Sequence, residues 1–353
     1  MLRRVITLFV AFVLLVGFGV AGMYLPVPYL VASPGITLNT IGEDQEGGPV
    51  IRIDGEDSYE HDGGLSMVTV QYSGGPSSRM DLFTVLSAWL SPSQAVLPEE
   101  ALFPPDRTVE EISKAQSVQM NDSQTNATAA ALTELGVDYD THALVAGVGE
   151  DMPAEGEIAK GDIITAVDGE PVDGKEEVVE EVGDRKPGDD VDITVDRDGK
   201  AEEFTLTTAK GDDGTPIIGV LVRNDMDFPV DVDISVGDIG GPSAGMMFSL
   251  GIMDRLSEES LTGGHKIAGT GTISPDGSVG AVSGVEQKMV SAQREGAEYF
   301  FVAEGACSQT FDSAATGDIE VVKIDKLGDA VDALKAIRTG DGADDLPRCE
   351  PKQ

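Results

Sequence analysis

The chain has 353 residues, of which 63 are acidic and 24 basic, and its formal net charge at pH 7 is −39. This balance argues against a nucleic-acid partner, because binding to phosphates needs clustered Lys and Arg side chains. The length allows two compact domains with a small appendage, and a hydrophobic fraction of 41% is enough for packed cores. The acidic excess indicates a solvated surface that favours solubility, and attraction of a basic substrate is the alternative explanation.

An uncharged apolar segment from Val5 to Leu25 predicts one transmembrane helix. A helix of this length spans about 30 Å, which is the hydrocarbon thickness of a bilayer. Arg3 and Arg4 precede the segment, so the positive-inside rule places residues 1–4 in the cytoplasm and everything after the segment outside it. The alternative is a cleaved signal peptide, because Gly19-Val20-Ala21 resembles a small-residue cleavage site.

The region after this segment, from 26 to 140, predicts short strands followed by helices. β-favouring runs at 50–53 and 67–70 are separated by Gly and Asp residues. Residues 81–90 then have the pattern of a short amphipathic helix, and residues 108–135 that of a long one.

From 141 to 210 the pattern changes to a compact β-rich unit. Lys160-Gly161-Asp162-Ile163-Ile164 is followed by Val167-Asp168-Gly169, a short helix is expected at 175–182, and Arg197-Asp198-Gly199-Lys200 is a hairpin signal. This order resembles the PDZ domains of bacterial extracytoplasmic proteases. The resemblance implies capture of a peptide as an added strand.

The same resemblance places a carboxylate-binding loop at 145–148. The alternative for this unit is a small β domain that packs against its neighbour and binds no peptide.

From 216 to 340 strands and helices alternate, which indicates an α/β domain with a mixed sheet. The β-rich unit is then inserted between two parts of one domain, and residues 341–353 are expected to be an irregular tail. The strands are expected at 217–222, 230–236, 267–273, 299–302 and 320–324, and the helices at 243–256, 285–295 and 327–337.

The only two cysteines are Cys307 and Cys349. Outside the cytoplasm this pair can form a disulfide that ties the tail to the domain, and two free thiols are the alternative. Two cysteines without a nearby histidine do not make a tetrahedral metal site, so we expect no metal.

A glycine-rich turn from Gly240 to Gly245 places Ser243 before an apolar helix, where a nucleophile can be built. Gly241 and Pro242 shape the turn, and the free amides of a helix N-terminus can bind an oxyanion. A serine nucleophile needs a base, and none of the three histidines lies in a triad motif. Lys288, on an expected helix with apolar neighbours, is the candidate base, because burial lowers the pKa of an ammonium group.

A second Gly-Gly-Pro-Ser string occurs at 74–77. It has no downstream counterparts of Thr270 and Lys288, so Ser77 is interpreted as a structural residue.

The run 237–245, followed by Ala268-Gly269-Thr270-Gly271-Thr272-Ile273 and by Gln287-Lys288, resembles the proteolytic domain of Lon-type serine peptidases. The resemblance implies Ser243 as nucleophile and Lys288 as general base. It also implies supporting roles for Thr270 and for the turn residues Gly241, Pro242 and Ala244. One departure is Ser283-Gly284, where Lon proteases usually have Gly-Gly.

With the apolar segment and the PDZ-like unit, the whole chain resembles the membrane-anchored, PDZ-containing Lon-like proteases of bacteria. This resemblance implies a Lon-type α/β (α+β) proteolytic domain at 216–340, a PDZ domain at 141–210 inserted before it, and an N-terminal part of the protease region at 26–140. The resemblance also implies protein or peptide substrates and the membrane as partners of the chain, and assembly into a homo-oligomeric ring.

No phosphate-binding loop of the form Gly-x-x-x-x-Gly-Lys-[Ser/Thr] occurs in the chain. We therefore expect peptide cleavage without ATP and without any cofactor. A non-catalytic PDZ adaptor with an inactive Lon-like fold is the alternative of a different class. A trypsin-like protease is a weaker one, because it needs a histidine and an aspartate in triad context.

Overall fold

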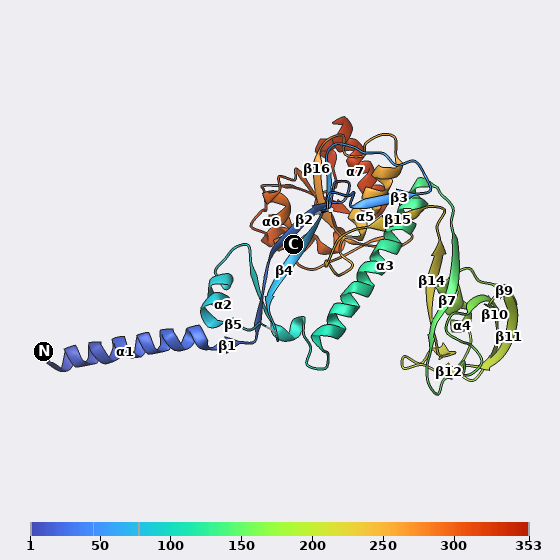
Figure 1. The fold of residues 1–353 in the computed structure, drawn as a ribbon, viewed down its shortest axis with the longest axis horizontal. Helices are drawn as coiled ribbons and strands as arrows, with labels where there is room; N and C mark the ends of the chain where they lie inside the picture. The colour runs from blue at the N-terminus through green and yellow to red at the C-terminus, as the bar shows by residue number, and fades with distance from the viewer. Residues whose placement is uncertain (1, 45, 77, 352–353) are drawn as a thin grey trace. The chain divides into compact units, whose positions relative to one another are not determined.

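The computed structural model describes residues 2–44, 46–76 and 78–351 (Figure 1). Ser77, of the second Gly-Gly-Pro-Ser string, lies outside the described residues. The chain forms a large unit from Met1–Val137 and Val230–Gln353, and an inserted unit from Asp138–Pro229. The chain thus leaves the large unit once and returns to it, as the sequence predicts.

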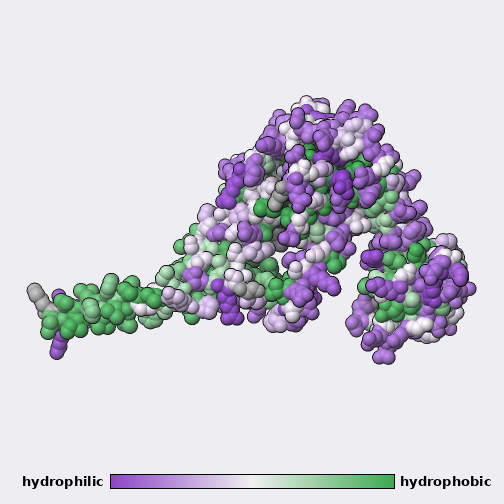
Figure 2. Space-filling view, viewed as in Figure 1, coloured by the Kyte–Doolittle hydropathy of each residue, from purple (hydrophilic) through white to green (hydrophobic). Residues whose placement is uncertain are grey.

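Helix α1, Leu2–Tyr24, contains the apolar segment. It is long and apolar enough to cross a membrane, and Gly22 is its one buried residue. On the face shown in Figure 2, hydrophobic residues cover this helix, whereas hydrophilic residues dominate most of the remaining surface.

A six-stranded mixed sheet forms the centre of the large unit, with the order β20-β19-β16-β4-β2-β6. Strands β4, β16, β19 and β20 run parallel to one another, and β2 is antiparallel to β4 and β6. The strands are β2 Tyr29–Asn39, β4 Gly64–Gly74, β6 Ala95–Pro98, β16 Lys266–Thr270, β19 Tyr299–Ala303 and β20 Glu320–Ile324. Because β4 precedes the insertion and β16 follows it, the two parts of the large unit share one sheet and one core.

Helices α5 Gly245–Leu256, α6 Val285–Arg294 and α7 Leu327–Thr339 pack against this sheet, and α3 Val109–Leu135 packs against α5. Residues 245–255 of α5 are all buried, so this helix is central to the core. The start of α3 follows from its sequence. Thr108 caps the helix in a capping box with Glu111, and Gly136 ends it in the left-handed conformation with φ 71°.

Shorter elements complete the large unit. Three two-stranded pairs join β1 to β5, β3 to β15 and β17 to β18, and α2 is a short helix. Their bounds are β1 Pro26–Val27, β3 Ile51–Asp54, β5 Met80–Asp81, α2 Leu82–Trp89, β15 Asp231–Ile234, β17 Thr272–Ile273 and β18 Val279–Gly280, with 3₁₀ helices at Glu99–Ala101, Glu304–Asp312 and Ala343–Asp345.

The inserted unit is a sheet in the order β11-β10-β8-β7-β14 with one helix, α4. The elements are β7 Asp140–Val148, β8 Ile163–Val167, β9 Glu170–Pro171, α4 Lys175–Gly183, β10 Asp190–Arg197, β11 Lys200–Thr207, β12 Ala209–Lys210, β13 Pro216–Ile217 and β14 Val220–Asp227. Asp198 and Gly199 have positive φ, as a two-residue hairpin turn between β10 and β11 requires. The unit runs on to Pro229, past residue 210, because β14 pairs with β7 along its whole length.

Residues 145–148 are not a loop, and the sequence-based placement of a carboxylate-binding loop there is wrong. They belong to β7, where Val145, Gly147 and Val148 pair with β14. Ala143 and Val145 are fully buried, so the alternation of buried residues in this run is that of a sheet strand.

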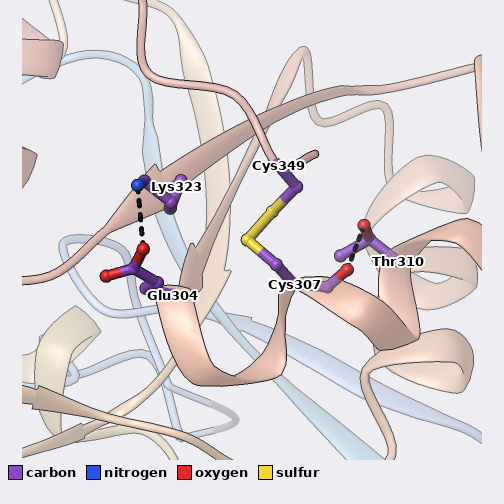
Figure 3. The surroundings of a disulfide bond; sticks show 5 residues. All are labelled: Glu304, Cys307, Thr310, Lys323 and Cys349. Atoms are coloured by element: carbon purple, nitrogen blue, oxygen red, sulfur yellow. Dashed lines mark hydrogen bonds and ion pairs between the residues drawn. A yellow bond between two sulfur atoms is a disulfide. The ribbon is translucent and has the colours of Figure 1, made fainter. Parts of the chain in front are cut away.

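The C-terminal tail is fastened to the large unit by a disulfide between Cys307 and Cys349, whose Cα atoms are 5.3 Å apart (Figure 3). Nearby, the Pro347 carbonyl accepts a hydrogen bond from the Lys323 amide at 2.8 Å, and Arg348 forms an ion pair with Glu320 at 2.7 Å. Within the described residues the segment is irregular apart from one 3₁₀ turn, and these contacts hold residues 347–349 in place.

Replacing both cysteines, Cys307→Ala with Cys349→Ala, is expected to lower the free energy of unfolding by about 2–4 kcal/mol. The bond closes a loop between cysteines with a sequence separation of 42. Removing the bond lets the unfolded chain regain the conformational entropy that loop closure takes from it. Urea unfolding of the full chain in detergent measures the change. A reducing agent should weaken the parent chain but not the double variant, and equal stability of the two chains would contradict the expectation.

Candidate active site

The turn that carries Ser243 is held from two sides. On one side, α3 fixes it: the Gly241 amide donates to the Gln116 carbonyl at 3.1 Å, and Ser123 Oγ donates to the Pro242 carbonyl at 3.2 Å. Gly241 has φ 93°, a conformation that glycine adopts without strain. At Gly245 the helix packs so closely that an added Cβ would lie 2.6 Å from Cγ2 of Ile273. Helix α5 begins here, so Ser243 precedes the helix and lies in the turn.

On the other side, the end of strand β16 binds the backbone of the same serine. The Ser243 carbonyl accepts hydrogen bonds from the Gly271 amide and from Thr270 Oγ1, each at 3.0 Å. The Met246 amide donates to the Gly271 carbonyl at 3.2 Å, which closes the connection between strand and helix. Ser243 is therefore positioned by its main chain, and its side chain is left for other partners.

Lys288, on the first turn of α6, contacts that side chain. Its Nζ lies 2.8 Å from Ser243 Oγ and 2.9 Å from Thr270 Oγ1. The lysine side chain is almost completely buried, and Thr270 is fully buried. Burial penalises the charged ammonium and lowers the pKa of Lys288 to about 8. Among the residues that the structure describes, no carboxylate forms an ion pair with Lys288 that would oppose this effect.

The departure at Ser283 does not disturb Lys288. Gly284 caps α6 with φ 73°, and an added Cβ there would lie 2.6 Å from Cγ2 of Val70. The position that needs glycine is therefore 284, which the chain retains. Ser283 is exposed, and Lys288 still reaches Ser243.

Two backbone amides at the start of α5 can stabilise a developing negative charge. Within the described part of the chain, the amides of Ser243 and Ala244 have no hydrogen-bond acceptor. They lie at a helix N-terminus, where the helix dipole favours an anion. Among the turn residues singled out from the sequence, Gly241 and Pro242 lie in the turn before these amides, and Ala244 carries one of them.

A cleft of about 790 Å³ opens beside Ser243 and Lys288. Its walls come from the turn, from β4 and from α3, and they are lined by, among others, Met67, Val70, Tyr72, Gln116, Gln119, Met120 and Ile239. The sequence analysis missed these wall residues. No local motif identifies them, because their position depends on long-range packing of α3 and β4 against the serine turn.

The histidines lie elsewhere. His61 Nε2 is 2.9 Å from the Ser257 carbonyl, and His265 Nδ1 is 2.9 Å from Glu298 Oε2. His142 belongs to β7 of the inserted unit. In the described residues no group of His, Cys, Asp and Glu could hold a metal ion.

Two family matches cover most of the chain after α1. Residues 115–208 match the PDZ domain family, and residues 225–334 match the Lon protease (S16) C-terminal proteolytic domain. No curated protein matches the chain.

Several solved structures are similar to part of the chain, and two of them are PDZ domains. The PDZ domain of the SdrC-like protein of Listeria innocua is 36% identical over 23% of this chain and 92% of that one, with a TM-score of 0.22. The corresponding domain from Listeria monocytogenes is 31% identical over 24% and 90%, with a TM-score of 0.23. The protein GtR34C of Geobacillus thermodenitrificans is 34% identical over 21% and 84%, with a TM-score of 0.20.

The Lon match supports a serine protease, and it ends at residue 334, within α7. The chain contains a PDZ domain and the C-terminal proteolytic domain of Lon (S16) proteases, behind an N-terminal helix that can cross a membrane, which is the organisation of a membrane-anchored, PDZ-containing Lon-like protease.

Proposed function

We propose that this chain is a serine endopeptidase that works without ATP, is anchored in the cell membrane by α1, and acts outside the cytoplasm. The observation that carries the proposal is the contact of 2.8 Å between Lys288 Nζ and Ser243 Oγ, made by a buried lysine whose pKa is lowered to about 8. A neutral amine at this position can accept the proton of the serine hydroxyl.

The mechanism follows from this contact. Ser243 Oγ attacks the carbonyl carbon of the scissile peptide bond while its proton passes to Lys288 Nζ. The amides of Ser243 and Ala244 stabilise the oxyanion, and the lysine ammonium then protonates the leaving amine. Water next attacks the acyl-enzyme, Lys288 accepts a proton from that water, and the proton returns to Ser243 Oγ as the new carboxyl terminus leaves.

Thr270 acts in this proposal as a positioning residue. Its Oγ1 donates to the Ser243 carbonyl and lies 2.9 Å from Lys288 Nζ. One hydroxyl therefore contacts both the base and the turn that carries the nucleophile. We assign the PDZ unit to the capture or positioning of peptide substrates, because PDZ domains bind extended peptides as added strands.

Thr270→Val is expected to lower kcat roughly 10- to 100-fold, because a displaced base costs about this much in rate. Valine keeps the volume of the buried side chain but removes its hydroxyl, and the Gly271 amide still binds the Ser243 carbonyl. Steady-state kinetics on a peptide measures the change. Thr270→Ser should retain most of the activity, because it keeps the hydroxyl. An unchanged kcat in Thr270→Val would contradict a positioning role for Thr270.

The proposed activity is tested with the full chain in detergent, an unfolded protein substrate, and mass spectrometry of the new N-termini. We expect equal cleavage with and without ATP and Mg²⁺. Cleavage that needs ATP would contradict independence from the nucleotide. Binding of peptides without any cleavage would favour a PDZ adaptor with an inactive protease fold.

A further inference from the structure

Helix α2 exposes an apolar surface that the fold leaves uncovered. The segment from Leu82 to Leu90 contains no charged residue, in a chain of which 25% is charged. Trp89 is 70% exposed and Leu90 72%, and Phe83 and Leu86 are each 45% exposed. Burying such side chains away from water is favourable, so a contiguous patch of this kind marks a contact surface.

The same helix lies beside α1 (Figure 1). A hollow between them is lined by Val16, Gly19, Val20 and Met23 of α1 and by Asp81, Phe83 and Thr84 at the start of α2. At Gly22 an added Cβ would lie 2.8 Å from Cε2 of Phe83, so the two helices touch where α1 has its glycine.

Strands β1 and β5 also hold α2 next to the end of α1. Strand β1 follows directly after α1 and pairs with β5, with Pro26 opposite Asp81 and Val27 opposite Met80. Helix α2 begins at the next residue, Leu82, and the Asp81 carboxylate caps it through the amides of Phe83 and Thr84. Helix α2 is thus tethered to the end of the apolar helix by both backbone and side-chain contacts.

The contact positions place α2 at a definite depth. Val16 to Met23 are the last turns of α1, and at a rise of 1.5 Å per residue they cover about 12 Å of a hydrocarbon layer that is about 30 Å thick. When α1 crosses a bilayer, Phe83 therefore lies at the level of the outer leaflet, and the exposed side chains of α2 face lipid or its interface.

We propose that α2 and Leu90 form a second membrane contact, lying in the interfacial layer of the bilayer that α1 crosses. The inference rests on the membrane anchoring in the proposed function, but not on proteolysis. Trp89 suits this position because tryptophan side chains concentrate at the boundary between lipid and water. Arg79 is exposed and has no ion-pair partner in the described parts of the chain, so it is available to a lipid phosphate.

The short chain between α1 and β2 also limits how far the cleft wall can lie from the end of α1. Tyr72 of the cleft wall is two residues before Gly74, and Gly74 pairs with Leu30, which follows the end of α1 at Tyr24 by six residues. At the reach of an extended chain, the cleft wall lies within about 30 Å of the end of α1. Substrate segments close to the membrane surface are therefore within reach.

Trp89 is the only tryptophan of the chain, so its fluorescence reports on this surface alone. We would reconstitute the full chain into phosphatidylcholine vesicles at a low protein-to-lipid ratio, and compare quenching by lipids brominated on their acyl chains with quenching by iodide in the water. The expected result is at least twofold quenching by the brominated lipids and little quenching by iodide. Strong iodide quenching without bromine quenching would overturn the inference.

The matched control moves the reporter. The double variant Trp89→Phe with Phe311→Trp places the only tryptophan at a position that is 39% exposed on the 3₁₀ helix at Glu304–Asp312. It should show the opposite pattern, with iodide quenching and no bromine quenching. Leu90→Asp keeps Trp89 but should reduce bromine quenching, because a charge next to it opposes burial in lipid.

Two further outcomes distinguish the α2 membrane contact from a contact between copies of the chain and from the α1 anchor. If Trp89 resists both quenchers, another copy of the chain covers α2, and the inference is wrong. Flotation of the vesicles on a density gradient tests α1 separately. Protein that floats without bromine quenching overturns only the α2 contact, and protein that does not float overturns the membrane anchor as well.

Discussion

Ser243→Ala is expected to lower kcat/KM for peptide cleavage by a factor on the order of 10⁴ or more, which is the usual result of removing a nucleophile. The side-chain hydroxyl is the one group of Ser243 that faces Lys288, whereas the main chain is held separately by Thr270 and Gly271. The change should therefore remove the chemistry and keep the fold. Initial rates on a fluorogenic peptide, with urea unfolding as the check on folding, measure both effects.

Lys288→Met should cause a loss of similar size, and the double variant should be no worse than either single one, because nucleophile and base act as a unit. The matched control is Ser283→Ala, a serine on the same cleft that is exposed, which should retain nearly full activity. Substantial cleavage by a folded Ser243→Ala protein would show that another residue is the nucleophile.

The rate of cleavage is expected to rise about tenfold per pH unit below pH 8 and to level off above it, because only the neutral form of Lys288 can accept the serine proton. Burial lowers the pKa of this lysine to about 8, so at pH 6 roughly one molecule in a hundred has the base in its active form. The direction follows from the charge: protonation at low pH removes the base, and deprotonation at higher pH restores it.

The pH dependence of kcat/KM measures this pKa in the free enzyme. Thr270→Ser should leave the midpoint near that of the parent chain, because the desolvation of Lys288 is unchanged. A midpoint near 6.5 would indicate a histidine base instead, and a profile that is flat from pH 6 to pH 9 would contradict a lysine base altogether.

The local part of the site could be predicted from the sequence. The glycine-rich turn around Ser243 is contiguous, and its features act over a few residues: a positive φ at Gly241, close helix packing at Gly245, and free amides at a helix start. Lys288 could be singled out because it lies on an expected helix with apolar neighbours.

The surroundings of the site could not be predicted in the same way. Gln116 and Met120 belong to α3, more than a hundred residues before Ser243, and nothing in a helix pattern says which distant turn its surface will contact. The pairing of β4 with β16 spans the whole insertion. These relations come from long-range packing, which the local periodicity of a single sequence does not contain.

The inserted unit shows the same limit on a smaller scale. The hairpin at Arg197 to Lys200 follows from its turn residues, whereas the loop expected at 145–148 is a strand. Alternating small and apolar residues at 145–148 are compatible with a loop and with a strand. The segment forms a strand because it pairs with β14, which is about 75 residues further along the chain. Turn chemistry is local, but strand partners are not.

The activation of Ser243 by Lys288 is the centre of the proposed mechanism, and a covalent probe tests it directly. The full chain would be treated at pH 8 with a fluorophosphonate, and the modified residue identified by mass spectrometry of its peptides. We expect an adduct on Ser243 that is almost absent in Lys288→Met. An adduct on a different serine, or equal labelling of Ser243 in the Lys288→Met variant, would contradict it.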